Sequence, residues 1–89
     1  SGNLKILLFF FSEMVPGCKN YESYFASSAF QSALAKYAPL KIDISKDRTL
    51  ASSYKVYRVP TIIVTDQNGS DILRFKSELS QQELLNQLQ

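Results

Sequence analysis

Residues 4–19 read LKILLFFFSEMVPGCK, and this stretch carries most of the information about the fold. Its first eight residues form a nearly continuous apolar run of β-favouring side chains, which indicates a strand buried on both faces. The Pro16–Gly17 pair then indicates a turn, and a helical pattern that begins at Cys18 follows it. We therefore expect a central strand that passes through a short loop into a helix.

The rest of the chain alternates helical and strand patterns. Apolar spacing predicts a helix over residues 18–36, interrupted near Ser27 and Ser28, either of which can cap a second piece over residues 29–37. The later expected elements are a strand over 40–44 after Pro39, a helix over 46–54 capped by Ser45, a strand over 59–64, a turn at 66–69, a strand over 70–75 and a helix opened by the Ser80–Glu83 capping box. This β-α-β-α-β-β-α order predicts an α/β fold with a four-stranded mixed sheet and helices on both faces.

Composition excludes several classes of function. The ten Lys and Arg residues are scattered among eight acidic ones, so we expect no nucleic-acid partner. With no histidine and one cysteine, the chain has neither an internal disulfide nor a zinc site of thiolate and imidazole ligands, and we expect no metal or other cofactor. The longest apolar run, residues 6–11, is far shorter than the roughly 20 residues that span a bilayer. We expect one domain over residues 4–89, preceded by a linker or cloning remnant at residues 1–3.

Two segments resemble the thioredoxin family. Residues 6–19 are similar, without a gap, to the segment around Trp-Cys-x-x-Cys-Lys, with Cys18 and Lys19 at its last two positions. Residues 56–61 are similar to the family's cis-proline segment, which implies a minimal thioredoxin-like fold with a cis Val59–Pro60 bond. Residues 19–31 resemble the broken first helix of bacterial DsbD C-terminal-type domains, which implies a bacterial, extracytoplasmic or periplasmic protein.

Three residues depart from the thioredoxin pattern. Val15 stands at the position of the attacking cysteine, Met14 at that of the preceding tryptophan, and Phe9 where many thioredoxins bury an aspartate. Because valine neither ionises nor forms a disulfide, Cys18 has no second thiol within the chain. The motif Val15-Pro16-Gly17-Cys18 is thus a degenerate Cys-x-x-Cys, and two-cysteine exchange is expected to be impaired.

The resemblance leaves two kinds of function open. In the first, the protein is a thiol:disulfide oxidoreductase in which Cys18 is catalytic, gains thiolate character from the helix N-terminus and Lys19, and reacts with a protein or peptide partner. In the second, Cys18 is a buried small hydrophobe and a redox-inactive domain binds a peptide or protein. The expected substrate-binding residues are Met14, Val15, Pro16, Gly17, Val59 and Pro60 in either case. We expect a monomer; a third possibility is a small regulatory or assembly domain of a larger membrane protein.

Overall fold

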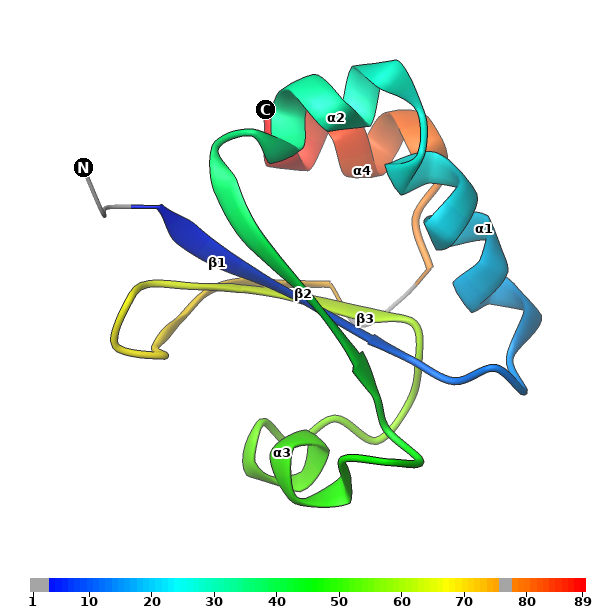
Figure 1. Ribbon diagram of the computed structural model, residues 1–89, viewed down its shortest axis with the longest axis vertical. Coiled ribbons are helices and arrows are strands. Elements are labelled where there is room, and N and C mark those ends of the chain that lie inside the picture. The colour runs from blue at the N-terminus through cyan, green and yellow to red at the C-terminus, as the bar shows by residue number, and fades with distance from the viewer. Residues whose placement is uncertain (1–3, 76–77) are drawn as a thin grey trace.

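The computed structural model describes residues 4–75 and 78–89. These residues form the elements β1 (Lys5–Phe11), α1 (Pro16–Phe25), α2 (Ser28–Leu34), β2 (Tyr37–Asp43), α3 (Arg48–Ser53), β3 (Thr61–Thr65), β4 (Asp71–Phe75) and α4 (Gln81–Leu88) (Figure 1). β1 pairs with β2 in parallel and with β3 antiparallel, and β3 pairs antiparallel with β4, so the sheet order is β2-β1-β3-β4. The predicted α/β class with a four-stranded mixed sheet is confirmed.

Helices cover both faces of the sheet. In Figure 1, α1, α2 and α4 lie on one side of the strands and α3 lies on the other. Successive side chains of β1 enter different cores: Leu7 and Phe9 belong to the cluster with α1, α2 and α4, whereas Leu8 and Phe10 belong to the cluster with α3. The first strand is therefore central and buried on both faces, as predicted.

The interrupted helix is present, with its first boundary shifted. α1 begins at Pro16, two residues earlier than expected, because the fixed φ of proline and its missing N–H suit the first helical position. Ser27, rather than Ser28, caps α2, and its Oγ accepts a hydrogen bond from the Phe30 N–H at 3.4 Å. The polar residue at the break thus starts the second helix.

The boundary between α2 and β2 was predicted wrongly. We expected a helix to residue 37 and a strand from residue 40, but β2 begins at Tyr37 and contains Pro39. β2 is an edge strand, with β1 as its neighbour in the sheet. Because the Ile44 N–H donates to the Phe11 carbonyl at 3.1 Å, the N–H groups of even-numbered residues here point toward β1, and Pro39 falls on the open side. Proline is tolerated there because it removes no hydrogen bond from the sheet.

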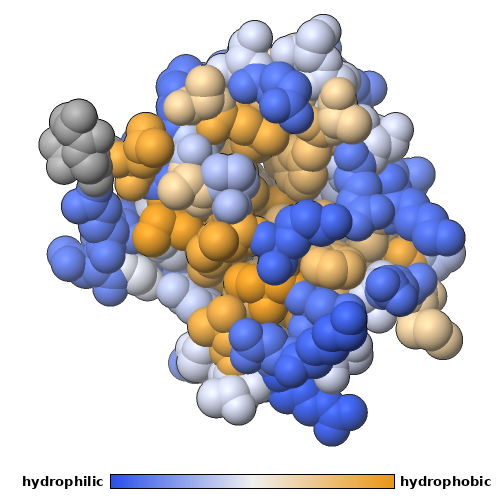
Figure 2. Space-filling view, viewed as in Figure 1, coloured by the Kyte–Doolittle hydropathy of each residue, from blue (hydrophilic) through white to orange (hydrophobic). Residues whose placement is uncertain are grey.

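Apolar side chains gather beside this open edge. Figure 2 shows them across the middle of the face on which Figure 1 places β2. Leu40 is 55% exposed, and a cleft of about 290 Å³ next to it is lined by Leu7, Phe9, Phe25, Gln31, Leu34, Pro39, Leu40 and Lys41. The proline and the lysine within the strand are features that discourage pairing with another strand at this edge.

The cap of α3 also differs from the prediction. We expected Ser45, but the Leu50 N–H donates to Oδ1 of Asp47 at 3.2 Å, which makes Asp47 the cap. The Ser45 N–H and hydroxyl group instead donate to Oδ1 of Asp43, at 2.9 and 2.6 Å. Asp43 thus closes a turn at the end of β2 and delays the start of the helix.

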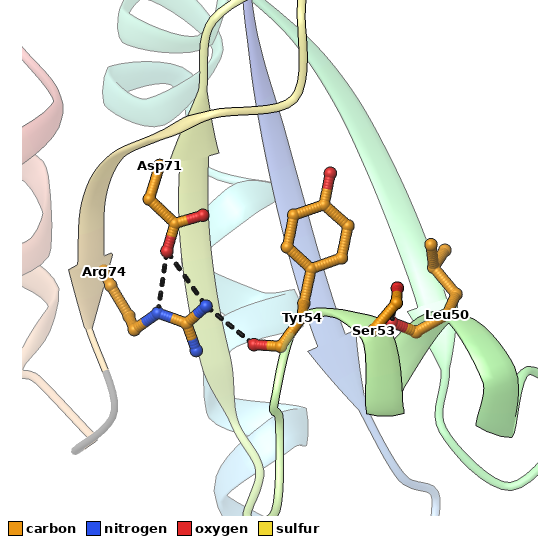
Figure 3. A network of polar contacts seen from close by, with 5 residues as sticks. All are labelled: Leu50, Ser53, Tyr54, Asp71 and Arg74. Atoms are coloured by element: carbon orange, nitrogen blue, oxygen red, sulfur yellow. Dashed lines mark hydrogen bonds and ion pairs between the residues drawn. The ribbon is translucent and has the colours of Figure 1, made fainter.

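A polar network joins the end of α3 to β4 (Figure 3). Nη2 of Arg74 donates to the Tyr54 carbonyl at 2.7 Å, and Nε of Arg74 donates to Oδ2 of Asp71 at 2.9 Å. At the same helix end, the Ser53 hydroxyl donates to the Leu50 carbonyl at 2.8 Å. One arginine thereby fixes this short helix against the far edge of the sheet.

The last elements begin close to where they were expected. β3 begins at Thr61 rather than at residue 59, because Pro60 has no N–H to donate to the sheet and remains in the preceding loop. The capping box of α4 is confirmed: the Glu83 N–H donates to Ser80 Oγ at 3.2 Å, and the Ser80 N–H donates to Glu83 Oε1 at 3.0 Å.

Candidate functional site

The first candidate feature is the loop that leads from β1 into α1. Val15 is the N-cap of α1, with an extended backbone (φ −111°, ψ 114°) and no side-chain cap, and Pro16, Gly17 and Cys18 are the first three helical residues. The loop is closed by the Val15 N–H, which donates to the Ser12 carbonyl at 3.2 Å. The position of the expected attacking thiol therefore lies at a helix N-terminus, but an isopropyl group occupies it.

Cys18 faces the core rather than solvent. Its side chain is 2% exposed and packs in the cluster that contains Phe9 and Tyr21. The Ser12 N–H donates to Sγ at 3.5 Å. Burial raises the pKa of the Cys18 thiol above its ordinary value, and the hydrogen bond from Ser12 offsets this only in part. The thiol is therefore protonated at neutral pH.

The charges around Cys18 differ from those expected. The carboxylates of Glu22 and Glu78 raise the pKa of the thiol further, because a thiolate would be repelled by both. Lys19, which we expected to favour the thiolate, is exposed and makes no corresponding contribution. The predicted activation of Cys18 is thus opposed by burial and by local charge, and its catalytic role stays a prediction.

Cys18 also borders a cleft between α1 and the end of β2. This cleft of about 490 Å³ is lined by Phe11, Ser12, Glu13, Cys18, Lys19, Glu22 and Lys41. Nζ of Lys41 lies 2.8 Å from Oε1 of Glu22 and 5.0 Å from the centre of the Phe11 ring. An ion pair and an aromatic ring therefore line the same cleft as Cys18.

The second candidate feature is the loop before β3. Its Val59–Pro60 peptide bond is cis. A Cβ atom on Gly17 would lie 3.4 Å from Cδ of Pro60, so the structure brings this loop against the start of α1. Two segments more than 40 residues apart in sequence thus form one surface.

The six expected binding residues are not equally accessible. Met14 is 88% exposed and Pro16 is exposed, whereas Val15, Gly17 and Val59 are half-buried and Pro60 is buried. Pro60 therefore lies beneath this surface, and its side chain is largely inaccessible to a partner. Tyr57, which the sequence analysis did not select, is 84% exposed and lies in the same loop as Val59. The sequence shows only a tyrosine two positions before Val59, and its exposure is a property of the folded chain.

Glu78 is a further residue that the sequence did not single out. Its carboxylate lies so close to Gly17 that a side chain there would collide with it, and the Asn20 amide donates to Glu78 Oε2 at 3.2 Å. Tyr21 holds Leu79, the residue that follows Glu78, because the Leu79 N–H donates to the Tyr21 hydroxyl oxygen at 2.6 Å. No local pattern connects Glu78 to the motif, because only the fold brings the segment after β4 to α1.

Over residues 4–75 and 78–89, His, Cys, Asp and Glu side chains form no group of three able to hold a metal ion. Within the same ranges, no helix is both long and apolar enough to cross a membrane.

Comparison with known proteins agrees with this architecture. The family model of the thioredoxin-like domain matches residues 1–89. The structure of the germline-specific thioredoxin Deadhead from Drosophila melanogaster is 30% identical with a TM-score of 0.83, over 98% of this chain and 80% of that chain. A mutant thioredoxin from Halobacterium salinarum is 25% identical with a TM-score of 0.80, over 99% and 74% of the two chains.

The fold is also shared by a more distant structure. A disulphide isomerase from Xylella fastidiosa shares the fold at 17% identity and a TM-score of 0.79, over 96% of this chain and 76% of that one. No curated protein matches the sequence. The family model covers every residue of the sequence, and the solved structures reproduce the sheet and its helices. The chain therefore belongs to the thioredoxin-like domain family.

Proposed function

We propose that this domain is a member of the thiol:disulfide oxidoreductases that is restricted to the chemistry of one thiol. The observation that carries the proposal is the placement of the motif: Val15 occupies the N-cap of α1, and Cys18, the one cysteine of the chain, is buried in the first turn. The helix start suited to an attacking sulfur is retained, but the sulfur is not.

A site with one thiol can carry out only the first half of disulfide exchange. A thiolate of Cys18 can attack a partner disulfide, form a mixed disulfide with one partner sulfur and release the other as a thiolate. In two-cysteine exchange, a second thiol of the enzyme then attacks the mixed disulfide and releases the bound partner. This chain has no such thiol, so the mixed disulfide persists until an external thiol reduces it.

The proposed partner is a protein or peptide. The motif loop contributes the exposed Met14 and the half-buried Val15, and the loop before β3 contributes Val59, whose backbone groups precede the first hydrogen bonds of β3. An extended segment placed across these loops can contact apolar side chains and pair with backbone groups at once. Structural similarity to a disulphide isomerase supports a partner of this kind.

A second candidate function is binding without thiol chemistry. The observation that favours it is the state of Cys18, which is 2% exposed and whose pKa is raised by burial and by two carboxylates. In this case the motif loop and the loop before β3 recognise a partner, and Cys18 only fills space in the core.

Val15→Cys is the experiment that separates the two functions. Residues at i and i+3 of a first helical turn lie within the range of about 4.4–6.8 Å between Cα atoms that a disulfide requires. We expect V15C to form an internal disulfide with oxidised glutathione, seen as a mass loss of about 2 Da, and to catalyse insulin reduction by dithiothreitol over many turnovers. The native chain should accumulate one mixed disulfide if Cys18 reacts, and none if the domain binds without thiol chemistry.

The control is Ser52→Cys, which adds an exposed thiol on α3, on the opposite face of the sheet. It should not catalyse the reaction. If V15C forms no internal disulfide, or forms one without accelerating insulin reduction, the retained fold does not support exchange and the second function stands. Multiple turnovers by the native chain would contradict the first proposal as well.

We further propose that the protein acts as a monomer in a bacterial extracytoplasmic compartment. The support for the compartment is the resemblance of residues 19–31 to DsbD C-terminal-type domains. Light scattering of the purified chain tests the monomer, and fractionation of the native host tests the compartment.

A further inference from the structure

Glu78 lies where the two loops of the proposed binding surface meet. Its carboxylate and Cδ of Pro60 are the groups that a side chain on Gly17 would meet. The Asn20 amide holds one carboxylate oxygen, Oε2, at 3.2 Å. A charged group thereby lies beside the first turn of α1 and the loop before β3, the two segments that carry Val15 and Val59.

Among residues 4–75 and 78–89, no lysine or arginine forms an ion pair with Glu78. In the described ranges, the ion pairs join Lys41 to Glu22 and Arg74 to Asp71, and neither includes Glu78. Glu78 is exposed, so water solvates its carboxylate in the free protein. Its charge is felt within the motif, since it contributes to the raised pKa of Cys18.

A bound partner changes that solvation. A segment that covers Met14, Val15 and Val59 also borders Glu78 and removes water from its carboxylate. Such desolvation is unfavourable unless the partner supplies an opposite charge or hydrogen-bond donors. The apolar side chains can therefore contribute affinity, whereas the carboxylate discriminates between partners by charge.

We propose that Glu78 is a specificity-determining residue, which selects partner segments that carry lysine or arginine beside the residue that contacts Val15 and Val59. This inference rests on the binding step of the proposed function. It does not require Cys18 to react, so the role of Glu78 and the redox chemistry of Cys18 can be refuted independently.

The test uses the native chain labelled with ¹⁵N and two extended peptides that differ only by lysine or glutamine next to a central valine. We expect the lysine peptide to bind about three- to fivefold more tightly, the range that an exposed ion pair supports. Amide shifts should appear at Gly17, Val59 and Leu79. The preference should diminish at high salt because solvent-exposed charges are screened.

Two variants locate the effect. Glu78→Gln keeps an oxygen that can accept from Asn20 but removes the charge, so both peptides should then bind equally. Glu13→Gln is the matched control, because Glu13 is an exposed acidic residue of the motif loop. The assignment to Glu78 is overturned if the preference survives in E78Q, if E13Q abolishes it equally, or if neither peptide binds the native chain.

Comparison with V15C keeps the two proposals distinct. Exchange by V15C without any peptide preference in the native chain would refute the role of Glu78 and leave the proposed function in place. A lysine preference with an inactive V15C would refute the redox proposal and leave the selection of a basic partner.

Discussion

Alkylation of Cys18 tests the central feature of the site. The perturbation is iodoacetamide added to the folded chain over a range of pH, with the urea-unfolded chain as reference. Because Cys18 is 2% exposed, modification requires a local opening of the structure. An opening free energy of about 3 kcal/mol would slow modification about 150-fold at a given pH. Burial and the nearby carboxylates also keep the pKa of the thiol above its ordinary value, which lowers the reactive thiolate fraction further.

The dependence on pH has a definite sign. A thiol whose pKa is higher in the folded than in the unfolded chain contributes stability that is complete below the unfolded pKa and is lost as pH rises through the folded pKa. Cys18→Ala should remove this alkaline loss, measured by urea unfolding. Mass spectrometry gives the modification rates. Modification of the folded chain at the rate of the unfolded chain, with an apparent pKa below about 8.5, would refute the argument that Cys18 belongs to the core.

Two further predictions concern the structure around the site. Tyr21→Phe removes the acceptor of the Leu79 N–H and should lower the free energy of unfolding by about 1–3 kcal/mol, and a urea midpoint no lower than that of the control Tyr24→Phe would contradict this. Hydrogen bonds from Ser80 hold the pKa of Glu83 below its ordinary value, so this stabilisation is complete above the unfolded pKa and is lost as pH falls through the folded pKa. Glu83→Gln should therefore flatten the loss of stability in acid, and equal pH slopes for both chains would count against this interpretation.

Local sequence patterns predicted the elements well because they reflect short-range physics. The apolar run ending at Phe11 forms the central strand, the break in the first helix falls at Ser27, and the Ser80 capping box opens α4. Each of these depends on residues within a few positions of one another. The prediction was wrong where the structure of a segment depends on residues far away in the sequence. Pro39 is the example, because it fits a strand only at the edge of the sheet, where β2 lies.

The family pattern and the chemistry of the motif can be read from the residues alone: a strand, a helix start with Val15 in place of a sulfur, and one cysteine without a partner thiol in the chain. The surroundings of that cysteine, in contrast, depend on long-range packing. Packing of α1 against the sheet buries Cys18, and the fold places Glu78 beside Gly17. Burial and the field of a distant carboxylate are properties of the folded chain, because they depend on residues that only long-range packing brings together.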